Sequence, residues 1–153
     1  MINSLFPPTA TAVAAMDIVE PITGGCQCGH VRYALKGTVY RLNICHCHDC
    51  QRQSGSAFGM SLVTPHDTFS LTSGELAMFE LTADSGRIKI GAFCPRCGVR
   101  IYNRTSALNS IKAGTLDDTS WLNPDAHYYT RSRQDWVTLP EGLPCFETHE
   151  HPD

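Results

Sequence analysis

Seven of the eight cysteines in this 153-residue chain fall into three tight clusters, and this grouping limits what the chain can become more than any other feature. The clusters are Cys26-Gln27-Cys28, Cys45-His46-Cys47-His48-Asp49-Cys50 and Cys94-Pro95-Arg96-Cys97. Cysteines this close in sequence rarely meet the separation and dihedral requirements of a disulfide. A C-x-x-C loop can instead direct two thiolates at one tetrahedral ion, with Zn–S bonds of about 2.3 Å. The spacing therefore predicts metal binding.

The seven cysteines divide into one closed set of four and one open set of three. Cys26 and Cys28 can share a zinc with Cys94 and Cys97, and a glycine after each pair permits the left-handed backbone that turns amides towards thiolates. Two alternatives stay open: four inert thiols, or a redox C-x-x-C. A redox pair favours a βαβ context, which the sequence lacks. Plant-type iron–sulfur spacing is also absent.

The central cluster contains Cys45, Cys47 and Cys50. Three thiolates bound to a dication would form a site with a net charge of about −1 and a vacant fourth position. A soft thiolate suits that position on zinc. The alternative is a closed site in which His46 or His48 is the fourth ligand. Successive side chains in a tight turn point apart, so we expect both histidines to face away from the metal. One of them, His48 first, is our candidate general acid.

Composition excludes several classes. With 42% hydrophobic and 18% charged residues, neither a disordered nor a membrane protein is indicated. The net charge is −3 and no basic block appears, so we expect no nucleic-acid partner. No apolar stretch approaches the roughly 20 residues that span a bilayer, so we expect no membrane partner.

The length predicts one domain. Residues 1–17 read as a loose extension, with Met16 as an alternative start, because they lack the basic segment of a signal peptide. Residues 18–148 form the expected zinc domain and residues 149–153 a polar tail. A chain without a signal is expected in the reducing cytoplasm, where clustered thiols bind metals more often than they form disulfides. The oligomeric state is left open.

Short β-like runs, broken by Gly, Pro, Asn and Asp, predict a mostly β domain of antiparallel sheets. The expected strands are 31–35, 39–45, 57–64, 75–82, 87–93, 99–103, 110–114, 127–132 and 136–139. Helical turns are expected only at 49–54 and 65–68.

The remaining reactive side chains carry weaker signals. Cys145 reads as a partly buried free thiol and His127 as a structural histidine. His149 and His151 lie in the polar tail and are expected in solvent. Five arginines are candidates for contact with an anionic ligand, although each alone is more typical of a solvated surface: Arg52, Arg96, Arg100, Arg131 and Arg133.

Together these segments resemble the glutathione-dependent formaldehyde-activating enzyme family, whose domain is shared with centromere protein V. The resemblance rests on Gly25-Cys-Gln-Cys-Gly-His-Val-Arg-Tyr, Cys45-His-Cys-His-Asp-Cys-Gln-Arg-Gln-Ser-Gly-Ser-Ala-Phe and Phe93-Cys-Pro-Arg-Cys-Gly-Val-Arg-Ile-Tyr. Pro124-Asp-Ala-His-Tyr-Tyr-Thr-Arg-Ser-Arg-Gln-Asp-Trp and Leu143-Pro-Cys-Phe are similar to its C-terminal part. The likeness runs from Ile18 to Phe146.

This resemblance implies an Mss4-like fold of antiparallel sheets held by zinc, with little helix. It implies two zinc ions per chain, a structural one on Cys26, Cys28, Cys94 and Cys97, and a second on Cys45, Cys47 and Cys50. In the family's namesake the second zinc is associated with adding glutathione to formaldehyde, which gives S-hydroxymethylglutathione.

The sequence therefore leaves two candidate functions. The first is a zinc-dependent carbon–sulfur lyase-type enzyme that adds a small-molecule thiol such as glutathione to formaldehyde or another small carbonyl. The second is a zinc-stabilised binding module or thiol carrier without catalytic activity.

Overall fold

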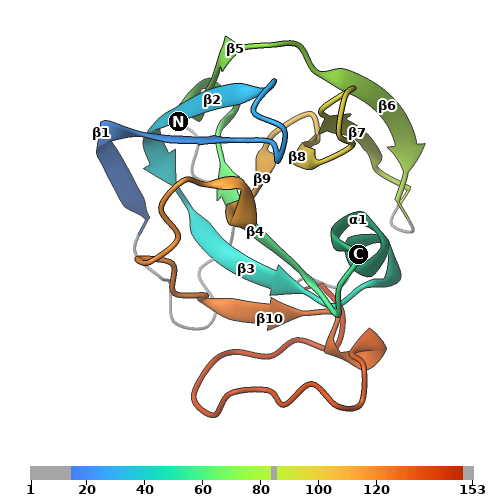
Figure 1. Cartoon of the computed structure of the whole chain (residues 1–153). Coiled ribbons are helices and arrows are strands. Elements are labelled where there is room, and N and C mark those ends of the chain that lie inside the picture. The colour runs from blue at the N-terminus through green and yellow to red at the C-terminus, as the bar shows by residue number, and fades with distance from the viewer. Residues whose placement is uncertain (1–14, 84–85, 150–153) are drawn as a thin grey trace.

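Two β-sheets make up most of the described chain, which covers residues 15–83 and 86–149 of this computed structural model (Figure 1). The smaller sheet has the strand order β1-β2-β5 and is antiparallel. Its strands are β1 (Met16–Gly25), β2 (Arg32–Val39) and β5 (Phe69–Ser73). Because β2 is central, its inward side chains are fully buried, and they include Tyr33 and Leu35.

The larger sheet has the order β10-β3-β4-β9-β8-β7-β6. All of its pairs are antiparallel except β10 with β3, which is parallel. Its strands are β3 (Arg41–Cys45), β4 (Gly59–Thr64), β6 (Ala77–Thr82), β7 (Ile88–Phe93), β8 (Arg100–Arg104), β9 (Asn109–Lys112) and β10 (Ala126–Tyr128).

Helical structure in the described ranges is limited to one short α-helix and three 3₁₀ turns. The helix α1 (His48–Ser54) follows β3 directly. The sulfur of Cys47 accepts a hydrogen bond from the backbone N–H of Cys50 and so caps the helix, and Gly55 ends it in the left-handed conformation. The 3₁₀ turns are η1 (His66–Thr68), η2 (Ala113–Thr115) and η3 (Thr130–Ser132).

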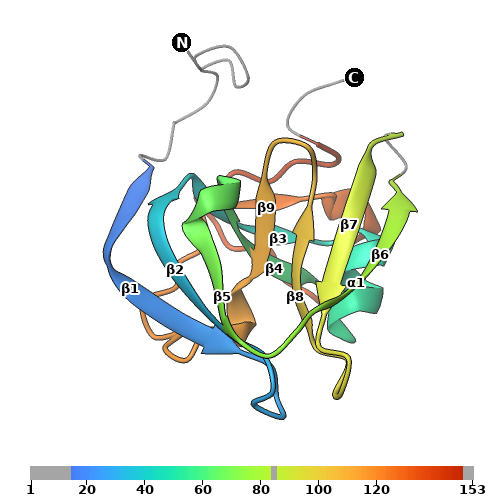
Figure 2. The same cartoon turned by 90° about the horizontal axis from the view of Figure 1, so that it is seen from above.

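The hydrophobic core lies between the two sheets. It contains Tyr33 and Leu35 from the smaller sheet and Leu62, Ile101 and Ile111 from the larger one, all with no exposed surface. Burial of each such side chain contributes about 1.5–3 kcal/mol. Figure 2 shows α1 beside β6, β7 and β8, at the end of the larger sheet that lies away from β1 and β2.

The mostly β, antiparallel fold predicted from the sequence is confirmed. The strand expected at 136–139 is wrong, because Trp136 lies in an exposed turn. The run expected at 127–132 splits into β10 and η3. Strands β1 and β5 were not expected, and most of the expected N-terminal extension, residues 1–14, lies outside the described residues. No helix in the described ranges is both long and apolar enough to cross a membrane.

Candidate metal centres

The structure brings together the four cysteines that the sequence assigns to one site. The sulfurs of Cys26, Cys28, Cys94 and Cys97, the four-cysteine cluster, all lie within 4.8 Å of one another. Cys28 Sγ is 3.5 Å from Cys26 Sγ and 3.7 Å from Cys94 Sγ. Four Zn–S bonds of about 2.3 Å at tetrahedral angles would separate the sulfurs by about 3.8 Å. All four thiols are free, and their spacing fits one zinc ion rather than disulfides.

Two similar turns present these thiols. Gly29 and Gly98 each follow the second cysteine of a pair and each has φ of +78°, a value that favours glycine. Each turn thereby aims backbone N–H groups at sulfur, and the Val31 N–H lies 3.2 Å from Cys26 Sγ. The backbone N–H groups of Val99, next to the second turn, and of Cys28, in the first turn, lower the pKa of Cys97 to about 6. Stabilised thiolates are the form that zinc binds.

The second group, Cys45, Cys47 and Cys50, is the three-cysteine cluster. Cys45 ends β3, Cys47 caps α1 and Cys50 lies in its first turn, so one strand–helix junction supplies all three. Their sulfurs also lie within 4.8 Å of one another, and each residue is partly exposed. Within residues 15–83 and 86–149, no His, Asp or Glu ligand atom joins this group at that spacing. The described part of the chain thus offers three ligands here.

The three thiols ionise very unequally. Hydrogen bonds from Cys45 and Cys50 lower the pKa of Cys47 to about 2, whereas hydrogen bonding with Cys47 and Cys50, together with burial, raises the pKa of Cys45. One proton therefore leaves the cluster easily and the last one with great difficulty. A divalent cation would offset the repulsion between neighbouring thiolates. This donor set therefore fits a metal such as zinc.

The two candidate histidines beside this cluster lie in different surroundings. His46 is fully buried, and its Nε2 lies 2.9 Å from Nδ1 of His127 on β10, with the two rings stacked. Burial lowers the pKa of His46 to about 4, so the ring is neutral near pH 7. His48 is exposed at the start of α1. Neither joins the clustered ligands, and the role of His48 as general acid stays a prediction.

The structure adds polar residues that sequence reasoning missed. Lys112 of β9 interacts electrostatically with all three thiols of the cluster, and Arg100 of β8 interacts with Cys50. Asn103 of β8 connects α1 to the sheet, because its Nδ2 donates to Gln53 Oε1 at 2.9 Å. These residues come from strands more than 45 positions away in sequence, so no local motif signals them; only the isolated Arg100 was named as a candidate.

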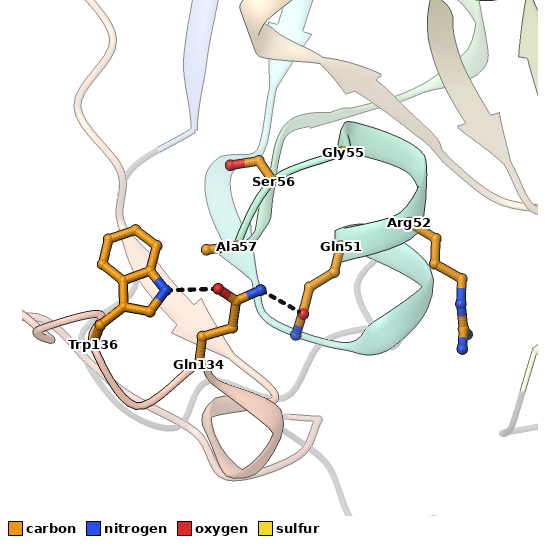
Figure 3. A pocket seen from close by; sticks show the side chains of 7 residues that line it. All are labelled: Gln51, Arg52, Gly55, Ser56, Ala57, Gln134 and Trp136. Atoms are coloured by element: carbon orange, nitrogen blue, oxygen red, sulfur yellow. Dashed lines mark hydrogen bonds between the residues drawn. The ribbon is translucent and has the colours of Figure 1, made fainter.

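An open hollow of about 500 Å³ lies beside α1 (Figure 3). Trp136 Nε1 donates to Gln134 Oε1, and Gln134 Nε2 donates to Gln51 Oε1 on the helix. Arg52 lines the same hollow and is exposed. The indole of Trp136 is 73% exposed, so a flat apolar surface borders the helix that bears Cys50 and is capped by Cys47.

The other candidates named from the sequence are scattered. Cys145 is exposed, not partly buried as expected, and lies in neither cluster. Arg96 and Arg131 are exposed, while Arg133 donates to the backbone carbonyl of Val137. His127 is buried and structural, as predicted, whereas His151 lies outside the described residues.

This architecture, two sheets with one set of four thiols and one set of three, defines a small β-protein with two cysteine clusters that could each hold a metal ion. The profile of the family "Glutathione-dependent formaldehyde-activating enzyme" matches residues 21–132, which is most of the chain. The chain belongs to this family, and the resemblance seen in the sequence is confirmed.

Similar proteins agree with this assignment. A Penicillium rubens protein named "Putative glutathione-dependent formaldehyde-activating enzyme" is 25% identical over 105 residues, which are 65% of this chain. The chain spans 54% of that relative's length. A crystal structure of a Rhodobacter sphaeroides protein matches with a TM-score of 0.53 at 15% identity, over 82% of this chain and 99% of that one. At this identity the match supports the fold alone.

Proposed function

We propose that this protein is a zinc-dependent carbon–sulfur lyase-type enzyme, which adds glutathione or a similar thiol to formaldehyde or another small carbonyl. The observation that carries the proposal is the three-cysteine cluster, whose partly exposed sulfurs lie within 4.8 Å of one another with no fourth protein ligand among the described residues. Membership of the family supports the choice of thiol and carbonyl. The name of the Penicillium rubens relative points the same way.

Each part of the site has a role in this proposal. The four-cysteine cluster holds a structural zinc, while Cys45, Cys47 and Cys50 hold the second. Zinc bound there would lower the pKa of a thiol at its open position and keep the thiolate in place. The sulfur electron pair forms the new bond to the carbonyl carbon, and the carbonyl π pair moves to oxygen. That oxygen then takes a proton, for which the exposed His48 is the candidate donor.

The domain assignment and the cellular location belong to the same proposal. Residues 18–148 would form the zinc domain, preceded by the extension and followed by the tail. The free state of all eight cysteines favours a reducing compartment such as the cytoplasm.

The second candidate function is a binding module or thiol carrier that performs no catalysis. The hollow beside α1 favours it, because an exposed Trp136 and a row of amide side chains suit contact with a peptide. A metal held by three cysteines next to that surface could then serve only to fix the helix.

Exchange NMR of formaldehyde and glutathione separates the two functions. The enzyme should accelerate interconversion of the free compounds with S-hydroxymethylglutathione above the uncatalysed rate, and Cys47→Ser should remove that acceleration. Cys145→Ser is the matched control, since its thiol is exposed and lies in neither cluster. An exchange rate that is the same with and without the wild-type protein would refute the enzyme and favour the carrier.

A further inference from the structure

One face of the larger sheet carries cations next to the three-cysteine cluster. Gly59 of β4 lies against Cys50, because a Cβ atom at Gly59 would be 3.2 Å from Cys50 Cβ and 3.5 Å from its sulfur. Ser61 lies two residues further along β4, so its side chain points to the same face as that Cβ would. The distance along the strand between Gly59 and Ser61 is about 6.6 Å.

Lys112 extends from this same face. It pairs with Ser61 in the register of β4 and β9, and its Nζ donates to Ser61 Oγ at 3.3 Å. This long contact with a neutral hydroxyl is the one hydrogen bond that the Lys112 side chain forms among the described residues. No carboxylate among those residues forms an ion pair with Lys112. Loss of solvation lowers the pKa of Lys112, while the thiols of the cluster oppose that effect. The ammonium group is thus half-buried, near the sulfurs, and has no carboxylate partner among the described residues.

Arg100 adds a second cation from β8, the strand next to β9. Its guanidinium lies 4.6 Å from the ring centre of Phe79, and its Nη1 donates to Asn103 Oδ1 at 2.7 Å. Gly91 makes room for it, since a Cβ there would be 2.7 Å from Arg100 Nη1. Asn103 in turn donates to Gln53 of α1, so the guanidinium is fixed relative to the helix that holds Cys50.

These cations are unusual for this chain, which carries a net charge of −3 and only three lysines. Two of the three lysines act electrostatically on the cluster, Lys112 on all three thiols and Lys89 on Cys47. A site with three cysteine thiolates, one zinc and one bound thiolate would carry a charge of about −2. Lysines near the cluster would partly balance that charge. A counter-charge alone, however, does not explain why the ammonium of Lys112 forms only one weak hydrogen bond, to a hydroxyl, among the described residues.

We propose that Lys112, with Arg100 beside it, forms an anion-binding subsite next to the three-cysteine cluster, and that the natural thiol of this site carries a carboxylate a few bonds from its sulfur. This inference rests on the proposed function, because it assumes that the thiol binds at the cluster. The carboxylate accepts a hydrogen bond from Lys112 Nζ, which is otherwise poorly paired, and charge-assisted bonds of this kind are about twice as strong as neutral ones. The site is therefore selective for anionic thiols over neutral thiols of the same size.

Calorimetric titration with 3-mercaptopropionate and with its uncharged amide tests this selectivity, because the two thiols differ only in the charged group. The zinc-loaded wild type should bind the acid about tenfold more tightly than the amide, a difference of about 1.4 kcal/mol. High salt should reduce that preference. Lys112→Met should abolish the preference and leave the affinity for the amide unchanged, whereas Lys112→Arg should keep it.

Lys36→Met is the matched control, since Lys36 is exposed on β2 in the other sheet and should behave as wild type. Equal binding of acid and amide to the wild type overturns the subsite and leaves thiol capture standing. An equal loss of affinity for both thiols in Lys112→Met, with loss of zinc, shows that Lys112 is only a counter-charge and also overturns it. If neither thiol binds the wild type, thiol capture itself fails and the subsite fails with it. Should Lys112→Met not fold, the comparison of acid and amide on wild type at low and high salt decides.

Discussion

Individual cysteines in this chain differ in what surrounds them rather than in their chemistry. Cys94 is fully buried between the sheets, Cys47 caps a short helix with its sulfur, and Cys145 is exposed. The three spacings in the sequence were enough to predict which sulfurs come together. They were not enough to predict Lys112, because a lone lysine in a strand carries no signal until the register places it beside Ser61.

At this scale, Cys47→Ser should remove one of the two zinc ions and leave most of the fold intact. The three-cysteine cluster closes a loop of only a few residues, so its loss releases little chain entropy. Elemental analysis should give about one zinc per chain for the variant and two for the wild type, with an unchanged far-ultraviolet circular dichroism spectrum. Cys145→Ser should retain both ions. Loss of both metals and of the β structure in Cys47→Ser would show that this cluster is structural as well.

Among the elements, the paired turns after β1 and after β7 matter most, because they bring residues from the two sheets to one cluster. Central strands such as β2 and β4 could be predicted, since buried residues recur along them. Strands β1 and β5 could not, because both are edge strands with mostly exposed side chains, and β1 contains Pro21 and an irregularity between Ile18 and Ile22. The strand expected at 136–139 does not form, because aromatic residues favour strands but Trp136 lies in an exposed turn.

Cys94→Ser should therefore unfold or aggregate the domain. Cys28 and Cys94 are 66 positions apart, and a link that closes a loop of this length stabilises the fold by on the order of 4 kcal/mol through chain entropy. That is a large part of the stability of an ordinary domain. Thermal unfolding followed by circular dichroism measures the effect. A soluble Cys94→Ser protein that melts cooperatively at the wild-type temperature would contradict the four-cysteine site.

For the whole molecule, the proposed function assigns stability to one cysteine cluster and chemistry to the other. The four-cysteine cluster joins the turns that follow β1 of the smaller sheet and β7 of the larger one, while the three-cysteine cluster lies at the junction of β3 and α1 (Figure 1). The mostly β class, both clusters and the family follow from local spacing and could be predicted. The parallel pairing of β10 with β3, the contact of His46 with His127 and the cations near the thiols depend on long-range packing and could not.

The proposed function requires a second zinc with an open position that captures a thiolate. Isothermal titration of the zinc-loaded protein with glutathione and with S-methylglutathione tests it most directly, because the methylated compound keeps both carboxylates but cannot supply a thiolate. We expect glutathione to bind, with an affinity that rises with pH towards the thiol pKa of about 8.5, and S-methylglutathione to bind at least tenfold more weakly. Equal binding of the two compounds, or binding of neither, would contradict capture of the thiolate by zinc.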